Sequence, residues 1–433
     1  MQQLKKPELK QAPTHQANKN TRGLIFLKNS SKKIELLSPA GDITCLKTAV
    51  EYGADAVYVG GQGFSMRTSP KNFSHDDMCS AISFAHKNNV KVYVTCNTLP
   101  RNNEIALLPS FFDSVKESGA DALIISDIGV LMTAKKHLPD IELHVSTQLG
   151  VVNYLTAKEL YNMGASRVVV ARELSLDEIC EIRVNTPKEL EIEAFVHGSM
   201  CVSFSGRCLL SSYLTGRDAN RGDCSQPCRW KYNLVEETRP DTFFPIAQNE
   251  DGTHILNSSD MCMIEHIDKL YNAGITSFKI EGRAKAEYYV ALTTNAYRHA
   301  IDGFLKNPSY KTEQWIIDEL DKISHREYGS GFYFGHEPKQ VYENGGYIRN
   351  YQVVGIVSGY EDGHLIISQR NKFEVGSELE ILEPKSKFVS CKVLKMLDSD
   401  NNEIQSAPHA MMTVKIPFDK KIKNGSYIRM KIK

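Results

Sequence analysis

Short apolar runs alternate with longer segments of helical periodicity over most of the chain. The first apolar run, 34–40, ends in a Pro-Ala-Gly-Asp turn, and the segment after it has helical spacing and stops at Gly53. Further apolar runs lie at 56–60, 91–97, 122–126, 142–148, 167–173, 191–198 and 277–282. We expect a strand in each run and a helix between most of them.

A weak internal repeat supports a closed barrel. The stretches "YGADAVYVG", "SGADALIIS", "MGASRVVVA" and "AGITSFKIE" each place a glycine and a short turn before a buried strand, as repeated βα units do. Eight such units between Ile34 and about Leu305 match the roughly 250 residues of a parallel (β/α)8 barrel. No G-x-G-x-x-G or Walker loop follows a strand, so nucleotide cofactors are not indicated.

The predicted fold class is therefore α/β, a (β/α)8 TIM-like barrel followed by a small all-β C-terminal domain. Short strands and turn residues from Asn350 onward predict the second part. The expected division is a flexible basic extension at 1–33, the barrel at 34–310 with a cysteine-rich insert at 197–262, a helical linker at 311–349, and a small β-barrel domain at 350–433. Lys420, Lys421 and Lys423 near the end are candidates for phosphate contacts, or for a strand edge kept soluble by charge.

The net charge and composition of the whole chain do not indicate a polyanionic partner. Lys+Arg and Asp+Glu are both 52, so the net charge is zero and any surface for nucleic acid must be local. No apolar run approaches the length that spans a bilayer, and the polar N-terminus lacks the apolar core of a secretory signal. We expect a cytoplasmic protein without membrane contact, in which thiols stay reduced.

Clustered cysteines are the strongest chemical signal. Cys201, Cys208, Cys224 and Cys228 are separated by six, fifteen and three residues, and such thiolates can hold zinc or an iron–sulfur cluster. Only the last pair has the usual zinc spacing, which favours the cluster. Unligated thiols and a nucleophilic pair of His197 with Cys201 or Cys208 stay open as alternatives. Neither H-E-x-x-H nor G-x-S-x-G occurs.

Polar residues at the expected strand ends complete the candidate site, because barrel enzymes build their sites there. We predict catalytic roles for His197, Glu281 and Arg283. We predict substrate binding by Asn97, Gln148, Arg172, Arg207, Arg217 and Lys279. Arginine and lysine suit a dicarboxylate or an RNA phosphate. A salt bridge at the barrel rim is the alternative role for Glu281 and also for Glu173, another carboxylate at an expected strand end.

These residues carry a resemblance to a known family. The segment "EAFVHGSMCVSFSGRCLLSSYLTGRDANRGDCSQPCRW", with "ELLSPAGD", "GADAVYVGG" and "SFKIEGRAKAEYYVA", resembles the collagenase-like peptidase family, peptidase family U32. The resemblance covers nearly the whole chain after the N-terminal extension. It is nearest to the branch that makes 5-hydroxyuridine at the wobble position of tRNA in a prephenate-dependent, oxygen-independent reaction. Sister branches hydroxylate ribosomal RNA or the ubiquinone ring.

The resemblance implies a tRNA uridine hydroxylase with a [4Fe-4S] cluster on Cys201, Cys208, Cys224 and Cys228 and with prephenate as co-substrate. It also implies tRNA as a partner and allows a second family member as a partner subunit. Cys262 is a fifth candidate ligand, so the fourth ligand stays open between Cys228, preferred for compactness, and Cys262. The alternatives are a U32-type peptidase and a hydroxylase of ribosomal RNA.

Overall fold

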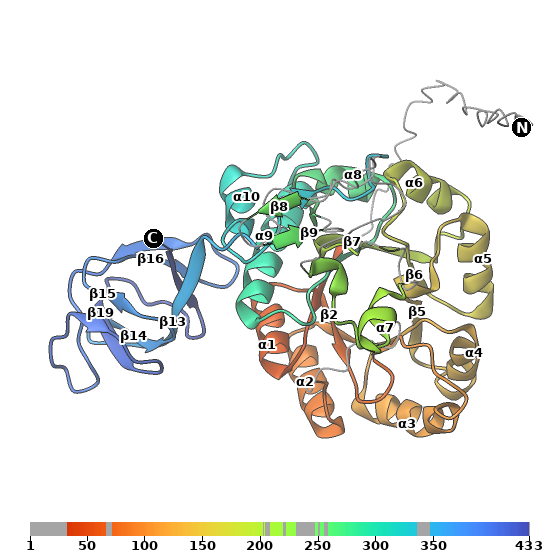
Figure 1. Cartoon of the computed structure of the whole chain (residues 1–433), viewed down its shortest axis with the longest axis horizontal. Helices are drawn as coiled ribbons and strands as arrows, with labels where there is room; N and C mark the ends of the chain where they lie inside the picture. Colours follow the sequence, from red (N-terminus) through yellow and green to blue (C-terminus); the bar gives the residue numbers. More distant parts are fainter. Residues whose placement is uncertain are drawn as a thin grey trace, which may run out of the picture.

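The computed structural model shows a helix-covered barrel with a smaller all-β domain at its side (Figure 1). It describes residues 33–65, 72–201, 203, 208–219, 222–230, 247–249, 252–254, 259–335 and 347–432. The predicted N-terminal extension therefore lies, except for Lys33, outside the described residues.

Eight parallel strands among the described residues close into the barrel. Each strand pairs with the next along the chain, and the last, β11, pairs with both β7 and β1. The strands are β1 (Glu35–Pro39), β2 (Ala56–Gly60), β3 (Lys91–Cys96), β4 (Ala122–Ile125), β5 (Glu142–Val145), β6 (Arg167–Val169), β7 (Glu191–Ser199) and β11 (Ser277–Ile280). Each falls in one of the predicted apolar runs, which confirms the predicted barrel.

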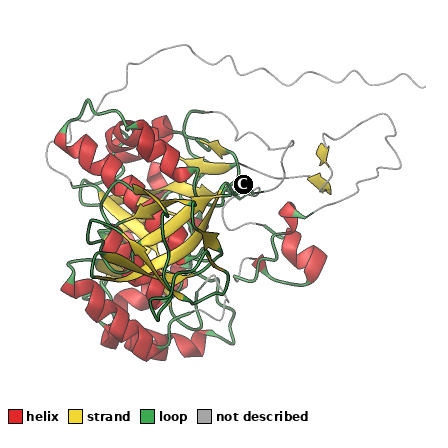
Figure 2. Cartoon of the chain, turned by 90° about the vertical axis from the view of Figure 1, so that its left-hand side faces the viewer, coloured by secondary structure: helices red, strands yellow, loops and turns green. Residues whose placement is uncertain are grey.

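Helices enclose the barrel, red around yellow in Figure 2. They are α1 (Ile43–Tyr52), α2 (His75–Lys87), α3 (Leu108–Ser118), α4 (Ile128–His137), α5 (Tyr154–Met163), α6 (Leu176–Val184), α8 (Ile267–Asn272) and α9 (Glu287–Lys306), with 3-10 turns η1 (Ile105–Leu107), η2 (Thr147–Leu149) and η5 (Ile264–His266). Asp42 caps α1 by accepting from the Cys45 N–H, and Gly53 ends it at a φ of 107°, a conformation that glycine adopts at little cost. The main hydrophobic core lies between the helices and the strands.

The cysteine-rich insert joins β7 to α8. It contains α7 (Leu210–Thr215), η4 (Pro227–Arg229), β8 (Ala247–Asn249), β9 (Gly252–His254) and β10 (Asp260–Cys262). Strand β10 runs antiparallel to β7 and pairs on its other side with β12 (Tyr328–Gly329). The segment expected to be a helical linker thus contains α10 (Gln314–Leu320) and also a strand that extends the barrel sheet.

The C-terminal domain has its own core and an antiparallel sheet. Its strands are β13 (Tyr351–Glu361), β14 (His364–Gln369), β15 (Phe373–Glu374), β16 (Glu378–Leu382), β17 (Val389–Lys392), β18 (Ser406–Ala407), β19 (Thr413–Pro417) and β20 (Tyr427–Lys431). Within residues 347–432, six of these pair in the order β17-β16-β20-β13-β14-β19, with β15 and β18 as a separate pair. The outer strands β17 and β19 do not pair directly in that range, but Leu397, in the segment after β17, bridges to Lys415 of β19. The β-barrel form of this domain stays a prediction.

Buried ion pairs fix this domain to the barrel. The Arg429 side chain is fully buried; it donates to Glu319 of α10 at 2.5 Å and to Glu380 at 2.8 Å. Lys322 binds the same two carboxylates at 3.0 and 2.8 Å. Such a closed charge network specifies one docking geometry. No helix in the described part of the chain is both long and apolar enough to cross a membrane.

Candidate active site

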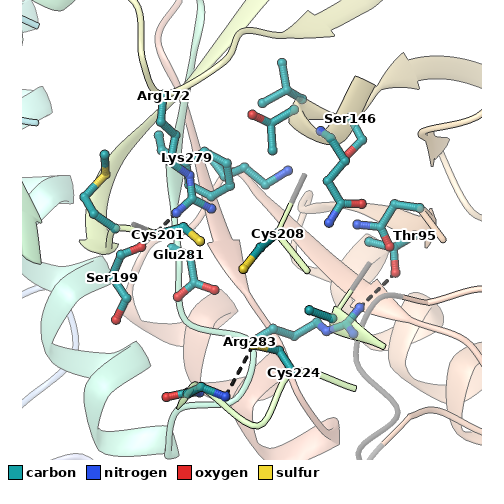
Figure 3. A pocket seen from close by; sticks show the side chains of 18 of the residues that line it. Thr95, Ser146, Arg172, Ser199, Cys201, Cys208, Cys224, Lys279, Glu281 and Arg283 are labelled. Carbon is teal, nitrogen blue, oxygen red and sulfur yellow. Dashed lines mark hydrogen bonds between the residues drawn. The ribbon is translucent and has the colours of Figure 1, made fainter. Parts of the chain in front are cut away.

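A pocket opens at the carboxyl ends of the barrel strands, with the cysteine-rich insert forming part of its wall. Its cavity volume is about 240 Å³, enough for a small molecule. Figure 3 shows Cys208 at the centre of the view, with Arg172 and Lys279 above it and Arg283 below. The predicted site residues that line it are Asn97, Gln148, Arg172, Lys279, Glu281, Arg283, Cys201, Cys208, Cys224 and Cys228.

Arg172, directly after β6, supplies a cation on one wall. Its Nη1 donates to the Ser199 carbonyl at 2.8 Å, and its guanidinium lies 4.0 Å from the centre of the Phe195 ring. Its Nε is buried and has no hydrogen-bond partner among the described residues. Since buried donors are normally satisfied, this nitrogen is suited to an anionic ligand.

Arg283 supplies a second cation from the loop after β11. Its Nη1 donates to the hydroxyls of Ser65 at 2.5 Å and Thr95 at 2.9 Å. The side chain passes over Gly60, where a Cβ would lie 2.5 Å from the same nitrogen. The absence of a side chain at Gly60 therefore allows Arg283 to reach the pocket.

Amide and carboxylate groups complete the strand-end residues. The Ser126 hydroxyl lies 3.1 Å from the Asn97 carbonyl and 3.3 Å from Gln148 Oε1, so it links the ends of β3 and β5. Glu281 is held through its backbone: its N–H donates to the His197 carbonyl, and its own carbonyl accepts from the Tyr289 hydroxyl at 2.8 Å. These contacts leave the side chains of Asn97, Gln148 and Glu281 lining the pocket.

The pocket cysteines sit on a wall shaped by α7. The Ser225 N–H donates to the Ser211 hydroxyl of α7 at 3.0 Å, which fixes the turn that carries Cys224. Gln226 has a φ of 56° and donates its N–H to Cys224 Sγ at 3.4 Å. This contact fixes the position of the Cys224 sulfur in the turn. All ten cysteines are described, and none forms a disulfide.

Four cysteines make up the candidate donor set for a metal centre. Among the residues that the structure describes, no three His, Cys, Asp or Glu side chains are placed to hold one metal ion. A cubane takes one thiolate at each of four separate irons, so its ligands stand further apart than the ligands of one zinc ion. Cys201, Cys208, Cys224 and Cys228 all line one pocket, so they are the candidate ligands for such a cluster.

Cys262 lies elsewhere. It ends β10, pairs across the ladder with His197, and hydrogen-bonds to Tyr297 rather than lining the described pocket wall. Burial raises the pKa of Cys262 to about 12, which disfavours the thiolate that a metal needs. Cys228 therefore lines the described pocket and Cys262 does not, and the choice of fourth ligand stays a prediction.

The predicted catalytic role of His197 does not fit the structure. A bulge shifts the register so that His197 pairs with Ile280, and its ring turns outward against Tyr289, Tyr297 and Tyr328. Burial lowers the pKa of His197 to about 3, so the imidazole is neutral. It is 1% exposed and does not line the described pocket, so it cannot serve as a base there.

Two other predicted residues that the structure describes do not line the pocket. Arg217 is half exposed and binds Asp223 through Nε at 2.8 Å and Nη2 at 2.5 Å. Neither Arg217 nor Glu173 is among the described lining residues. Arg207 lies outside the described residues.

Several lining residues escaped the sequence analysis. Tyr58, Thr95, Ser146 and Phe195 lie on inward positions of strands or just after them. Alternation within each strand was the available signal, because every second residue of a barrel strand faces the interior. The same alternation also marks Glu193, a buried carboxylate within an otherwise apolar run.

Sequence comparisons identify the family to which this chain belongs. The profile of peptidase family U32 matches residues 41–343, and that of the family's C-terminal domain matches 349–429. The chain is 35% identical to tRNA hydroxylation protein P1 of Bacillus subtilis, over 92% of this chain and 95% of that one. It is 46% identical to an uncharacterized protease of Methanocaldococcus jannaschii, over 70% and 73%. It is 38% identical to the 23S rRNA 5-hydroxycytidine C2501 synthase of Escherichia coli, over 70% and 46%. The chain belongs to peptidase family U32.

Proposed function

We propose that this protein hydroxylates the wobble uridine of tRNA to 5-hydroxyuridine without oxygen, using a [4Fe-4S] cluster and prephenate. The observation that carries the proposal is the meeting of Cys201, Cys208, Cys224 and Cys228 with the cations Arg172, Lys279 and Arg283 in one pocket. A redox centre and a site for a small dicarboxylate would then be adjacent. A nucleophile with its base would be expected of a peptidase instead.

The choice between tRNA and ribosomal RNA as the substrate rests on how much of each relative this chain matches, as well as on sequence identity. The relative named for tRNA hydroxylation is matched over 95% of its length, whereas the relative named for ribosomal RNA is matched over 46%. The match therefore extends over nearly the whole of the former relative and over about half of the latter. We favour tRNA as the substrate.

The side chains divide the work by their chemistry. Arg172, Lys279 and Arg283 would bind the carboxylates of prephenate, for which guanidinium forks are well shaped. Asn97 and Gln148 offer amide donors and acceptors for the edge of a uracil ring. Glu281 is the carboxylate among the described lining residues and is suited to accept the proton that leaves C5. A bound cluster would supply one-electron chemistry next to these groups.

The peptidase alternative lacks its catalytic pair in this geometry. No histidine is among the described lining residues, and His197 is enclosed by tyrosines. Cys201 and Cys208 therefore have no imidazole base at the pocket in the described part of the chain. Support for proteolysis comes from the family name and from the name of the Methanocaldococcus jannaschii relative.

The RNA surface is better sought at the pocket rim than at the C-terminal lysines. Lys420 and Lys423 lie 3.5 and 3.8 Å from Glu383 and Glu51, so part of their charge is already balanced. We further propose a cytoplasmic setting, where thiols stay reduced, and a second family member as a partner subunit.

The fourth cluster ligand can be tested directly. We expect Cys228→Ala to lose iron and sulfide, because Cys228 lines the pocket, and Cys262→Ala to keep both, because Cys262 lies behind the wall. Iron and sulfide assays on the anaerobically purified variants distinguish Cys228 from Cys262 as the fourth ligand. Loss of the cluster in Cys262→Ala and its retention in Cys228→Ala would transfer the role to Cys262.

Gly60 gives a test of Arg283. A methyl group at this position would lie 2.5 Å from Arg283 Nη1 and 2.6 Å from Ser65 Oγ, so Gly60→Ala should push the guanidinium aside. We expect hydroxylation at low prephenate to fall about tenfold or more, since small displacements at a reacting site are costly. Gly129→Ala in α4 is the control. Equal activity in both variants would mean that the position of Arg283 does not matter.

Nucleoside mass spectrometry of a deletion strain tests the function. We expect 5-hydroxyuridine to disappear from tRNA and to return with a plasmid copy, while hydroxylated nucleosides of ribosomal RNA stay unchanged. Loss of a ribosomal modification with intact tRNA would identify the sister activity instead.

A further inference from the structure

The described interior of this barrel contains both an apolar cluster and a group of charged side chains. On β1 to β4 the inward residues form a compact apolar cluster of Leu37, Ala56, Tyr58, Tyr93, Ala122 and Ile124. On β5, β6, β7 and β11 the inward positions hold His144, Arg167, Glu193 and Lys279, each at most 5% exposed. Barrel interiors are usually filled by branched apolar side chains, and buried charges are costly unless paired.

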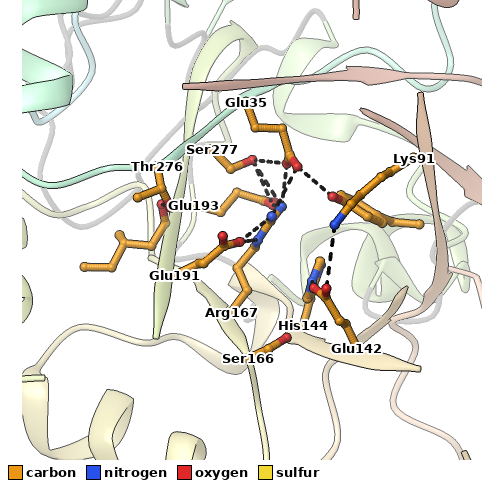
Figure 4. Close-up of polar contacts among 12 residues, drawn as sticks. Glu35, Lys91, Glu142, His144, Ser166, Arg167, Glu191, Glu193, Thr276 and Ser277 are labelled. Atoms are coloured by element: carbon orange, nitrogen blue, oxygen red, sulfur yellow. Dashed lines mark hydrogen bonds and ion pairs between the residues drawn. The ribbon is translucent and has the colours of Figure 1, made fainter. Parts of the chain in front are cut away.

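Glu193 is the residue at which these charges connect. Its Oε2 accepts from Arg167 Nη1 at 3.0 Å, and its Oε1 accepts from Lys279 Nζ at 2.7 Å. Arg167 is fixed in turn by Glu35 at 2.6 Å and Glu191 at 2.5 Å (Figure 4). The ionic contacts therefore connect Glu35 and Glu191 with Arg167, and Arg167 through Glu193 with Lys279.

Lys279 is the end of this chain that reaches the pocket. Its Nζ lies 4.5 Å from the centre of the Tyr58 ring and 5.5 Å from that of Phe195, and all three residues line the pocket. The aromatic faces attract an ammonium but leave it free to slide. The carboxylate of Glu193 gives it a fixed position.

The charge of Lys279 also depends on this contact. Burial lowers the pKa of the lysine, and the negative charge of Glu193 opposes that effect. Burial alone would raise the pKa of Glu193, but Lys279 and Arg167 outweigh it and lower that pKa to about 2. Each residue therefore favours the ionised form of the other.

We propose that Glu193 is a positioning residue that holds the Lys279 ammonium at the pocket floor as a fixed anchor for a carboxylate of the small co-substrate. The inference rests on the proposed function for the identity of that co-substrate, but not for the contact itself. Arg167 acts one step further back, because it holds the second oxygen of Glu193.

Glu193→Gln tests the proposal, because it keeps the shape and removes the charge. The matched control is Glu191→Gln, which removes a carboxylate from Arg167 on the same strand and leaves the Lys279 contact in place. With cluster-loaded protein, we expect the Kd and KM for prephenate to rise about tenfold or more in Glu193→Gln, with kcat at saturation nearly unchanged. Glu191→Gln should behave as wild type.

A double-variant cycle separates positioning from a direct or structural role. If Glu193 acts through Lys279, then adding Glu193→Gln to Lys279→Met should cause no further loss of prephenate binding. The double variant also removes both charges together, so it remains usable if Glu193→Gln alone folds poorly. An equal loss on either background would overturn the proposal.

One measurement does not depend on prephenate. The rate at which acetic anhydride acetylates Lys279, followed by peptide mass spectrometry, should rise several-fold in Glu193→Gln and stay constant in Glu191→Gln, because only the first frees the lysine. An unchanged rate would overturn the positioning role. If the acetylation rate rises in Glu193→Gln but the wild-type protein does not bind prephenate, the contact is upheld and the proposed co-substrate is refuted.

Discussion

Cys208→Ala is expected to abolish the cluster. Anaerobically purified wild-type protein should be brown and contain about four iron and four sulfide per chain, the composition of a cubane held by four thiolates. Cys208 lines the pocket together with Cys201, Cys224 and Cys228, and a cubane with three ligands and an alanine at this central position should be lost during purification. Iron and sulfide should fall close to zero.

Cys391→Ala is the matched control for this variant. Cys391 lies in β17 of the C-terminal domain, far from the pocket in sequence and outside its lining, so its replacement should leave iron and sulfide unchanged. Both variants should show the circular dichroism of the wild type. Stoichiometric zinc without sulfide in the wild type would refute the cluster, whatever the variants show.

Arg167→Met is expected to cause the largest loss of stability. The Arg167 side chain is almost fully buried and contacts the carboxylates of Glu35, Glu191 and Glu193. Removing the guanidinium would leave these negative charges close together with less compensation. Breaking a buried ion pair from one side costs about 3–5 kcal/mol. The free energy of unfolding from urea titration should fall by that amount.

The surface pair of Arg217 and Asp223 provides the control for Arg167. Arg217→Met also removes a guanidinium with a carboxylate partner, but in a setting exposed to water, where ion pairs contribute little. Its urea midpoint should match that of the wild type. If Arg167→Met also unfolded at the wild-type midpoint, the charged floor of the barrel would have to be solvated rather than buried.

Sequence alone predicted the strands of the barrel because each is a short apolar run between glycine-ended helices. It also predicted the charged residues and the cysteines that line the described pocket, since residues that follow barrel strands meet at one end of the fold. Asn97, Gln148 and Arg172 were found in this way. These positions follow from strand order, without any knowledge of side-chain contacts.

His197 and Arg217 show what the pattern could not predict. Phe195 faces the pocket, so simple alternation would place His197 there too, but one extra residue in β7 turns its ring outward. Arg217 lies close to the cysteines in sequence, yet it pairs with Asp223 and does not line the described pocket. A bulge and a local ion pair are both invisible in the spacing of residues.

The most direct test of the account is a reaction with purified components. Cluster-loaded protein is incubated anaerobically with prephenate and tRNA from the deletion strain, and the tRNA is digested and analysed by mass spectrometry. We predict that the wobble uridine gains one oxygen atom, that omission of prephenate prevents the gain, and that Cys208→Ala protein is inactive. Equal gain of oxygen with Cys208→Ala protein would contradict the account.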